Sequence, residues 1–216
     1  ILKKKPKKLY VVEKDNDLAS YLEKNFKNQI KIINKDILQL NENHVSDEEL
    51  IVFGNLPYNI STEILCKWIL NIDDHKIWFS NLVLMFQKEV ADRIISNFNS
   101  SNYSRLTILA NWKLNIKKIL DIKPNSFSPK PKIDSTLLIF SPKKNFLKLK
   151  NPYVLEKITR VFFSHRRKMI KKPYYQIFPN NEKIINKLNI NLNLRPQNLD
   201  FETYYKLAVE YEKLRG

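Results

Sequence analysis

The sequence predicts an α/β protein in which a parallel sheet, covered by helices on both faces, is followed by a small all-helical domain. Short apolar runs of strand length alternate with helical spacing of apolar residues in the first part of the chain, as in βαβ units. A basic stretch at residues 141–150, with Pro142 and Pro152, interrupts this pattern, and only helical spacing follows it. We therefore expect a sheet-containing domain at residues 1–145 and a helical domain at residues 146–216.

Each strand of the predicted sheet is an apolar run followed by polar or turn-forming residues. These runs occupy residues 9–13, 30–34, 50–53, 82–86, 113–122 and 136–140. Helices are predicted to begin near Asp15, an N-cap residue, and near Ser61 and Gln87. The apolar face of the first helix comprises Leu18, Leu22 and Phe26. Helical spacing in the second domain covers residues 154–162, 184–188 and 201–209.

The charge and the composition of the chain limit its function. Lys and Arg total 38 against 22 Asp and Glu, a net charge of +16, so charge alone favours nucleic acid as the partner. A base composition that favours Lys and Asn codons is the alternative explanation of this charge. One cysteine and three widely spaced histidines do not predict a disulfide framework or a metal site. The two glycines, Gly54 and Gly216, cannot form a glycine-rich phosphate loop, which excludes complete dinucleotide-binding dehydrogenases and P-loop enzymes.

The sequence shows neither a membrane segment nor a secretion signal. Its longest apolar runs have the length of a strand and are far shorter than a membrane span. Residues 1–6 are basic, but no apolar segment follows them. We therefore expect a cytoplasmic, monomeric protein that binds no metal.

The sharpest chemical signal is Asn55-Leu56-Pro57-Tyr58, directly after an apolar strand. In open α/β sheets, ligands bind just beyond the carboxyl ends of the strands. The Asn55 side-chain oxygen and the adjacent backbone carbonyl can both accept hydrogen bonds from one exocyclic amino group. Pro57 fixes the backbone angle, and Tyr58 offers a flat face on which a heterocycle can stack. The alternative is a turn that uses Asn and Pro only for its geometry.

Six segments resemble, in the same order, motifs of the ribosomal RNA adenine N6-dimethyltransferases. They are GNLPYNIST (54–62), LMFQKEVADR (84–93), YSRL (103–106), NSFSPKPKIDS (125–135), FSHRRK (163–168) and RPQNL (195–199). Together they span most of the chain, which is therefore similar to the KsgA-type dimethyladenosine transferases of small-subunit ribosomal RNA. The resemblance implies a Rossmann-like methyltransferase sheet, S-adenosylmethionine as the cofactor, and dimethylation of N6 on two adjacent adenines.

The resemblance also implies which residues bind the cofactor: Glu13, Lys14, Asp36, Ile37 and Asn55. Glu13 resembles the acid that binds the two ribose hydroxyls. Asp36 resembles the acid that reads the adenine amino group, with Ile37 packing on the ring. The residues alone leave two alternatives open, because Glu13 could be an exposed acid paired with Lys14 and Asp36 could be a helix N-cap.

Catalysis is assigned by the same resemblance to Asn55, Leu56, Pro57, Tyr58 and Phe127. Asn55 and the Leu56 carbonyl would hold the amino group of the target adenine. Tyr58 would stack on that base, and Phe127 would cover its other face or the transferring methyl group, although a lone Phe is more often a core residue. Accepting the amino protons localises the nitrogen lone pair, so no histidine base is required. An adenine within an RNA helix must first be turned out of the stack.

Six basic residues are candidate RNA contacts. They are Arg105, Lys130, Lys132, Arg166, Arg167 and Lys168. The alternative for each is a charged side chain that only faces solvent. The partner that the resemblance implies is small-subunit ribosomal RNA, in an immature small ribosomal subunit.

The chain departs from the family pattern at several places. The glycine-rich cofactor turn that follows the family's first strand has no counterpart here, so we expect an N-terminally truncated piece that is inactive by itself. Ser104 stands where the family usually has glycine, and Ser164-His165 alters the basic motif. Two other functions stay open: a ribosome-assembly factor that binds RNA without catalysis, and an N6-adenine methyltransferase of large-subunit RNA or DNA.

Overall fold

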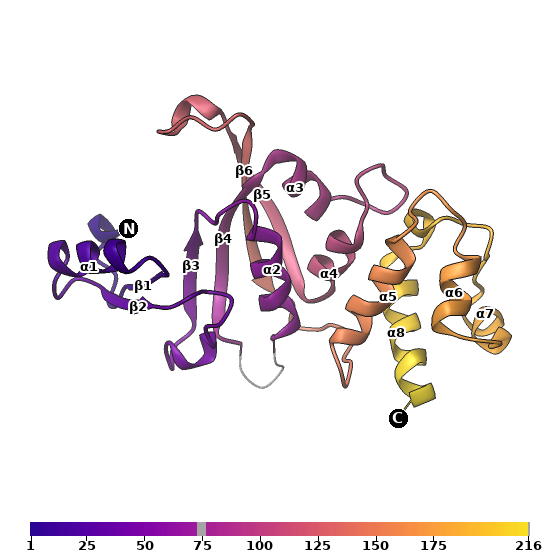
Figure 1. Cartoon of the computed structure of the whole chain (residues 1–216). Coiled ribbons are helices and arrows are strands. Elements are labelled where there is room, and N and C mark those ends of the chain that lie inside the picture. The colour runs from indigo at the N-terminus through magenta and orange to yellow at the C-terminus, as the bar shows by residue number, and fades with distance from the viewer. Residues whose placement is uncertain (73–76, 216) are drawn as a thin grey trace. The chain divides into compact units, whose positions relative to one another are not determined.

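The computed structural model describes residues 1–72 and 77–215 of the chain (Figure 1). They form two compact units, Ile1–Glu49 and Leu50–Gly216. The boundary that the sequence predicts between residues 145 and 146 lies inside the second unit, and the separate helical domain stays a prediction. Among the described residues, no helix combines the length and the apolar character needed to cross a lipid bilayer.

The first unit is a two-stranded parallel sheet with one α-helix. Its elements are a 3-10 helix (Leu2–Lys4), β1 (Tyr10–Glu13), α1 (Asn16–Asn25), β2 (Lys31–Asn34) and a second 3-10 helix (Glu42–His44). The helix begins where the sequence predicts, because the Asp15 carboxylate accepts a hydrogen bond from the Leu18 amide at 2.8 Å. The apolar face predicted for α1 is only partly buried within this unit: Leu18 is 45% exposed, and Leu22 and Phe26 are half-buried.

The second unit is built on a four-stranded mixed sheet with the order β3-β4-β6-β5. The strands are β3 (Leu50–Gly54), β4 (Phe79–Gln87), β5 (Leu114–Ile122) and β6 (Ser135–Pro142). β3 and β4 are parallel, as predicted, but β6 is antiparallel to both of its neighbours. The strand–helix alternation that predicts parallel pairing ends before β5, and residues 123–134 join β5 to β6 directly, without the crossover helix that parallel strands require.

The core of the second unit lies on one face of this sheet. Leu82, Leu84 and Phe86 of β4 are fully buried together with Leu138 and Phe140 of β6. Three helices contribute to this core: α2 (Ser61–Leu70), α3 (Lys88–Ile94) and α4 (Arg105–Lys113) (Figure 1). The other face is open at β3 within this unit. Ile51 and Phe53, which alternate with the inward-facing positions, are 59% and 56% exposed.

The sequence pattern did not predict α4. This helix contacts α2, α3 and β5 on one side and helices of the C-terminal region on the other. Its buried residues therefore lie around most of its circumference and give no single apolar stripe. They are Thr107, Ile108, Leu109, Ala110, Trp112 and Lys113. A helix that is buried on several sides lacks the amphipathic periodicity by which a surface helix is recognised.

Four α-helices follow the sheet. They are α5 (Tyr153–Phe163), α6 (Lys171–Ile177), α7 (Glu182–Leu188) and α8 (Phe201–Arg215), with a 3-10 helix at Pro196–Asn198 before the last. The sequence predicts three of these; α6 is only seven residues long and contains Pro173, so it shows little periodicity. The helices α5 and α8 pack closely, with the rings of Phe162 and Tyr204 5.7 Å apart. Tyr103, just before α4, joins the same aromatic cluster through Phe201 at 5.4 Å.

Tyr103 provides a test of this packing. Its hydroxyl is buried and has no hydrogen-bond partner among the described residues. Because burying an unpaired hydroxyl is unfavourable, Tyr103→Phe should leave the free energy of unfolding unchanged or raise it by about 1 kcal/mol. Urea unfolding of this chain measures the change.

A neighbouring tyrosine in the same cluster serves as the matched control. Tyr204 is equally buried, but its hydroxyl donates to the Pro196 carbonyl at 2.8 Å. Tyr204→Phe should therefore lower the free energy of unfolding by about 1 kcal/mol, because it removes a hydrogen bond from a carbonyl that keeps only the longer one from the Leu199 amide, at 3.4 Å. Equal losses in the two variants would show that the Tyr103 hydroxyl does have a partner.

Candidate functional site

The first unit brings three of the predicted cofactor residues to one edge of its sheet. Glu13 ends β1, and its carboxylate accepts the Asp15 amide at 2.8 Å. Asp36 follows β2, accepts the Leu38 amide at 2.9 Å and forms an ion pair with Lys14 at 2.8 Å. The hydrogen bond to Asp36 raises the pKa of Lys14 above its usual value. The carboxyl ends of parallel strands meet at one sheet edge, which explains why both acids lie here.

The chemistry of this edge fits the nucleoside part of S-adenosylmethionine. Carboxylates are acceptors, and the ribose hydroxyls and the adenine amino group are donors. Ile37, the half-buried residue after Asp36, supplies apolar surface next to these acceptors. The alternatives from the sequence are also visible, since Asp36 caps a local turn and Lys14 is paired, although with Asp36 and not with Glu13.

The second unit places the Asn55–Tyr58 segment between β3 and α2. Asn55 and Pro57 are exposed, while Leu56 and Tyr58 are half-buried. The segment is closed by a turn in which the Ile60 amide donates to the Pro57 carbonyl at 3.1 Å. The Ser61 hydroxyl donates to the Tyr58 carbonyl, also at 3.1 Å, at the first residue of α2. The structure thus presents Asn55 at the carboxyl end of a strand, on a turn whose backbone is fixed on its C-terminal side.

Gly54 is required at the last position of β3 by close packing. A Cβ atom there would lie 2.8 Å from the Leu84 side chain and 3.0 Å from the Leu56 side chain. Leu84 is fully buried and is the register partner of Gly54 in β4, so a larger residue would have to displace core atoms. The glycine therefore allows the chain to pass close to β4 immediately before Asn55.

Tyr58 is anchored at its far end. Its hydroxyl and the Ser135 hydroxyl are 2.7 Å apart, and Ser135 is the fully buried first residue of β6. The hydrogen bond joins the Asn55–Tyr58 segment to the base of the 123–134 loop, which carries Phe127. Ser135 lies in one of the six sequence motifs, but the sequence alone predicts no role for it. A buried serine at a strand start, directly after a polar loop, was the available signal.

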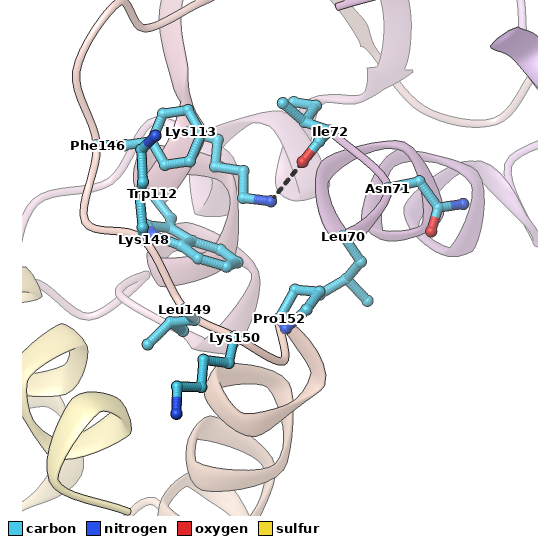
Figure 2. Close-up of a pocket in the computed structure, with 10 residues that line it drawn as sticks. All are labelled: Leu70, Asn71, Ile72, Trp112, Lys113, Phe146, Lys148, Leu149, Lys150 and Pro152. Atoms are coloured by element: carbon cyan, nitrogen blue, oxygen red, sulfur yellow. Dashed lines mark hydrogen bonds between the residues drawn. The ribbon is translucent and has the colours of Figure 1, made fainter. Parts of the chain in front are cut away.

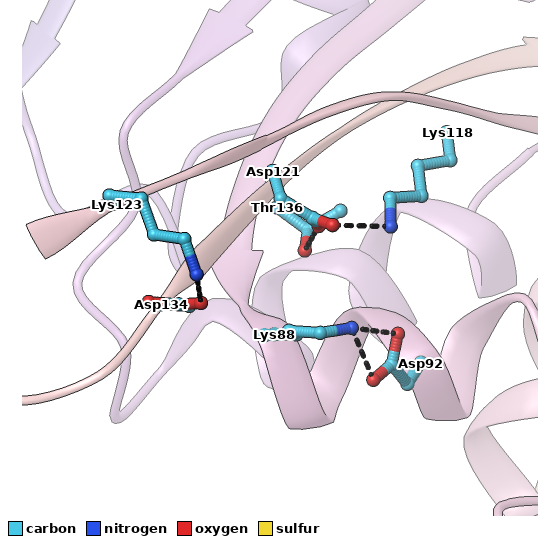
Figure 3. A network of polar contacts seen from close by, with 7 residues as sticks. All are labelled: Lys88, Asp92, Lys118, Asp121, Lys123, Asp134 and Thr136. Atoms are coloured by element: carbon cyan, nitrogen blue, oxygen red, sulfur yellow. Dashed lines mark hydrogen bonds and ion pairs between the residues drawn. The ribbon is translucent and has the colours of Figure 1, made fainter.

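The loop that carries Phe127 is closed at its base by an ion pair and a backbone hydrogen bond (Figure 3). Lys123 and Asp134, at its two ends, form an ion pair at 2.6 Å, and the Asp134 carbonyl accepts the Lys88 amide at 2.9 Å. Phe127 is half-buried, and its amide donates to the Pro124 carbonyl at 3.2 Å. Figure 1 shows the loop extending beyond the edge of the sheet.

A second set of polar contacts lies one step further along β5 and β6. Asp121 accepts hydrogen bonds from Lys118 at 2.7 Å and from the Thr136 hydroxyl at 2.6 Å (Figure 3). These two bonds, that of Lys118 first, hold the pKa of Asp121 below its usual value. Lys88 pairs with Asp92 at 2.9 Å, and its hydrogen bond to that carboxylate raises the Lys88 pKa.

The structure divides the candidate RNA contacts into two groups. Arg167, Lys168, Lys130 and Lys132 are exposed. Arg105 and Arg166 are half-buried and are engaged within the protein.

The protein's own groups satisfy both of these arginines. Arg105 forms an ion pair with Glu156 at 3.4 Å. The Arg166 guanidinium donates to the Ser100 carbonyl at 3.3 Å, to the Ser101 carbonyl and to the Gln197 side chain at 3.2 Å. Both arginines therefore connect α5 and its C-terminal end to other parts of the second unit, whatever their contact with RNA.

A pocket of about 280 Å³ lies at the opposite end of the strands (Figure 2). It is bordered by the end of α2, the end of α4 and the segment before α5. Lys113 is buried beside it, donates to the Ile72 carbonyl at 2.8 Å and lies 4.3 Å from the Trp112 ring centroid. Because ligands of open α/β sheets bind at the carboxyl ends, we do not place the reaction here.

Comparison with known proteins gives one family for almost the entire chain. The family model described as "Ribosomal RNA adenine dimethylase" matches residues 1–213. Ribosomal RNA small subunit methyltransferase A from Pelagibacter ubique (strain HTCC1062) is 68% identical over 216 residues, which are 100% of this chain and 82% of that protein. The protein of the same name from Ehrlichia canis (strain Jake) is 39% identical over 213 residues, covering 96% of this chain and 79% of that protein.

Two solved structures are similar to this one. A dimethyladenosine transferase from Plasmodium falciparum matches with a TM-score of 0.76 and 27% identity, over 96% of this chain and 82% of that chain. The 23S rRNA methyltransferase ErmE matches with a TM-score of 0.63 and 18% identity, over 95% of this chain and 82% of that chain. At that identity the second match concerns the fold alone. Together they confirm the predicted α/β methyltransferase fold.

The contacts of Asp121 predict a pH dependence of stability. Its pKa in the folded chain is below the ordinary 3.8, so its contribution is complete above about pH 4 and is lost as the pH falls through the folded value. Asp121→Asn should be less stable than the parent at neutral pH, and the difference should shrink below about pH 4. Thermal unfolding across this range measures it. Lys118→Met should show the same convergence; a constant difference would contradict the assignment to Asp121.

Proposed function

The chain belongs to the ribosomal RNA adenine dimethylase family, and from this membership we propose that Asn55 and its neighbours form the site that binds and activates the target adenine. The prediction of the family from the sequence motifs is confirmed. The reaction is the transfer of methyl groups from S-adenosylmethionine to N6 of adenine in small-subunit ribosomal RNA. The observation that supports the site is the exposed Asn55 at the carboxyl end of β3, followed by a turn anchored to β6.

The mechanism follows from how the adenine amino group reacts. Its lone pair is delocalised into the ring, which makes the nitrogen a weak nucleophile. The Asn55 side-chain oxygen and the Leu56 carbonyl would accept hydrogen bonds from its two N–H groups. These hydrogen bonds localise the lone pair on the nitrogen as the bond to the methyl carbon forms and the bond from that carbon to sulfur breaks. Acceptors placed where positive charge develops stabilise the transition state more than the ground state. Tyr58 supplies the face on which the turned-out base stacks, and Phe127 covers the other face.

Glu13, Lys14, Asp36 and Ile37 of the first unit would hold the nucleoside part of the cofactor. S-adenosylmethionine supplies an electrophilic methyl group when bound. The Glu13 carboxylate is suited to the ribose hydroxyls, and Asp36 to the adenine amino group, because both can accept hydrogen bonds from those donors. Ile37 contributes the apolar contact with the adenine ring.

The exposed basic residues Lys130, Lys132, Arg167 and Lys168 are proposed to contact RNA phosphates. The finer description of the partner, an immature small ribosomal subunit bound by a monomer, is part of this proposal. The 68% identical relative favours small-subunit RNA over the large-subunit alternative, because the similarity to ErmE extends only to the fold.

Asn55→Ala tests the adenine site. We define the extended protein as this chain joined to the residues of the Pelagibacter ubique relative that lie outside the match. In it, the variant should lower kcat by about 100-fold or more, since removing a transition-state hydrogen bond costs about 100- to 1,000-fold. RNA affinity should change by less than about twofold, because many basic side chains supply it.

The control for this variant lies in the same segment. Asn59 is also an exposed asparagine, and Asn59→Ala should retain the parental kcat. An active Asn55→Ala protein would rule out the proposed role of Asn55. RNA binding by the unaltered extended protein without any methylation would favour the alternative of a non-catalytic assembly factor.

The two groups of basic residues predict different responses to mutation. Arg167→Glu combined with Lys168→Glu should weaken RNA binding and reduce the slope of log affinity against log salt by about 0.7–0.9 for each phosphate that the protein no longer neutralises. Arg166→Met should instead lower the free energy of unfolding by about 2 kcal/mol, because it removes hydrogen bonds from a charged group. Filter binding at several salt concentrations and urea unfolding separate these effects. An unchanged slope in the double variant would mean that both side chains face only solvent.

A further inference from the structure

We propose that Ser135 is a positioning residue for the reaction, because its buried hydroxyl holds the phenol of Tyr58 and thereby sets the plane on which the target adenine stacks. This inference rests on the proposed function, in which Tyr58 is the stacking ring. It assigns a role to a residue that does not itself touch the base.

The geometry of the hydrogen bond fixes the ring without covering it. The two hydroxyl oxygens are 2.7 Å apart, which is a normal distance for a hydrogen bond between hydroxyls. A tyrosine ring is attached to the backbone at one end of its long axis, and here it is held by Ser135 at the other end. Both faces of the ring stay outside this hydrogen bond, which therefore restricts the tilt of the ring and leaves a face available for a base.

The anchor itself is rigid because of its place in the sheet. Ser135 begins β6, which lies between β4 and β5, and it pairs with Gln87 on one side and Ile122 on the other. Its side chain has no exposed surface. A positioning group works best on a regular element whose own rotamer is fixed by packing. Tyr58, in contrast, lies in a segment between β3 and α2 and gains its far-end support from this sheet position.

Ser135 also relates Tyr58 to the loop that carries Phe127. The residue before it, Asp134, closes that loop through its ion pair with Lys123 and through its carbonyl, which accepts the Lys88 amide. The support for Tyr58 and the base of the Phe127 loop are therefore consecutive residues at the start of one strand. Tyr58 and the loop that carries Phe127, the aromatic residues proposed for the two faces of the adenine, are thus both held by the start of β6.

A positioning role of Ser135 should affect the reaction rate more than the stability of the protein. In Ser135→Ala, the Tyr58 hydroxyl is deprived of this partner, but Tyr58 is half-buried, so water can replace the missing bond. The decrease in stability should therefore be small. The change in orientation is not compensated in this way, since a small misplacement of a reacting group can lower the rate by one or two orders of magnitude.

A double-mutant cycle in the extended protein tests the inference. Ser135→Ala and Tyr58→Phe should each lower kcat by about 10-fold and leave the KM for S-adenosylmethionine unchanged. The double variant should lose no more than either single variant, because both substitutions remove the same hydrogen bond. Ser141→Ala, at the other end of β6, is the matched control and should keep the parental kcat.

A second readout does not depend on turnover. A ribosomal RNA hairpin with 2-aminopurine at the target adenine reports stacking through quenching of its fluorescence. Quenching on binding should be weaker with Ser135→Ala than with Ser141→Ala, at equal RNA occupancy. Urea unfolding confirms that each variant is folded under the assay conditions.

The possible outcomes distinguish the role of Ser135 from the role of Tyr58. Full activity of Ser135→Ala, additive losses in the cycle, or unchanged quenching would each overturn the role of Ser135 while leaving the adenine site intact if Tyr58→Ala is inactive. Full activity of Tyr58→Ala would overturn the stacking role of Tyr58, and the inference about Ser135 with it.

Discussion

The antiparallel pairing of β6 between β4 and β5 is the constraint on which the candidate adenine site depends. Because β6 runs against both neighbours, β5 runs in the same direction as β3 and β4. The ends of β3, β4 and β5 therefore lie at the same edge as the beginning of β6. This arrangement brings the segment after Gly54 and the loop after Ile122 to one edge, where Ser135 links them through Tyr58. An all-parallel sheet would have placed the start of β6 at the opposite edge.

Local patterns predicted the elements, and the elements that escaped prediction are those shaped by tertiary contacts. The Asp15 cap and the apolar strands could be recognised because their physical causes lie within a few neighbouring residues. The helix α4 could not, because its apolar residues face several partners at once. The direction of β6 follows from its connection to β5 at residues 123–134, which contains a 3-10 helix but no crossover helix. Sequence motifs indicated Asn55 and Tyr58 as candidates, but the hydrogen bond with Ser135 joins residues 77 positions apart and leaves no local signal.

The basic charge of the chain has two physical uses, and composition could not separate them. Arg166 and Arg105 satisfy carbonyls and a carboxylate inside the second unit, so part of the positive charge holds the C-terminal helices to the α4 region. The chain as a whole carries a net charge of +16, and this charge creates an electrostatic field that attracts polyanions. A run such as Arg166-Arg167-Lys168 contains both kinds of residue, since the half-buried first member donates to the protein while the exposed pair faces solvent. Basic residues that are adjacent in the sequence can therefore have different roles.

RNA binding and the orientation of the target adenine place different physical demands on the protein. Contacts with phosphates depend weakly on geometry and are distributed over flexible lysine and arginine side chains, so they can recruit RNA without placing any single base. Orientation of one amino group requires the opposite properties: short side chains, a fixed backbone and a sheet as the support. Asn55 follows a glycine that packs against the buried Leu84, and Tyr58 is held by a residue without exposed surface. The rigid parts of the second unit therefore coincide with the residues proposed for chemistry, and the exposed loop and surface residues with those proposed for recruitment.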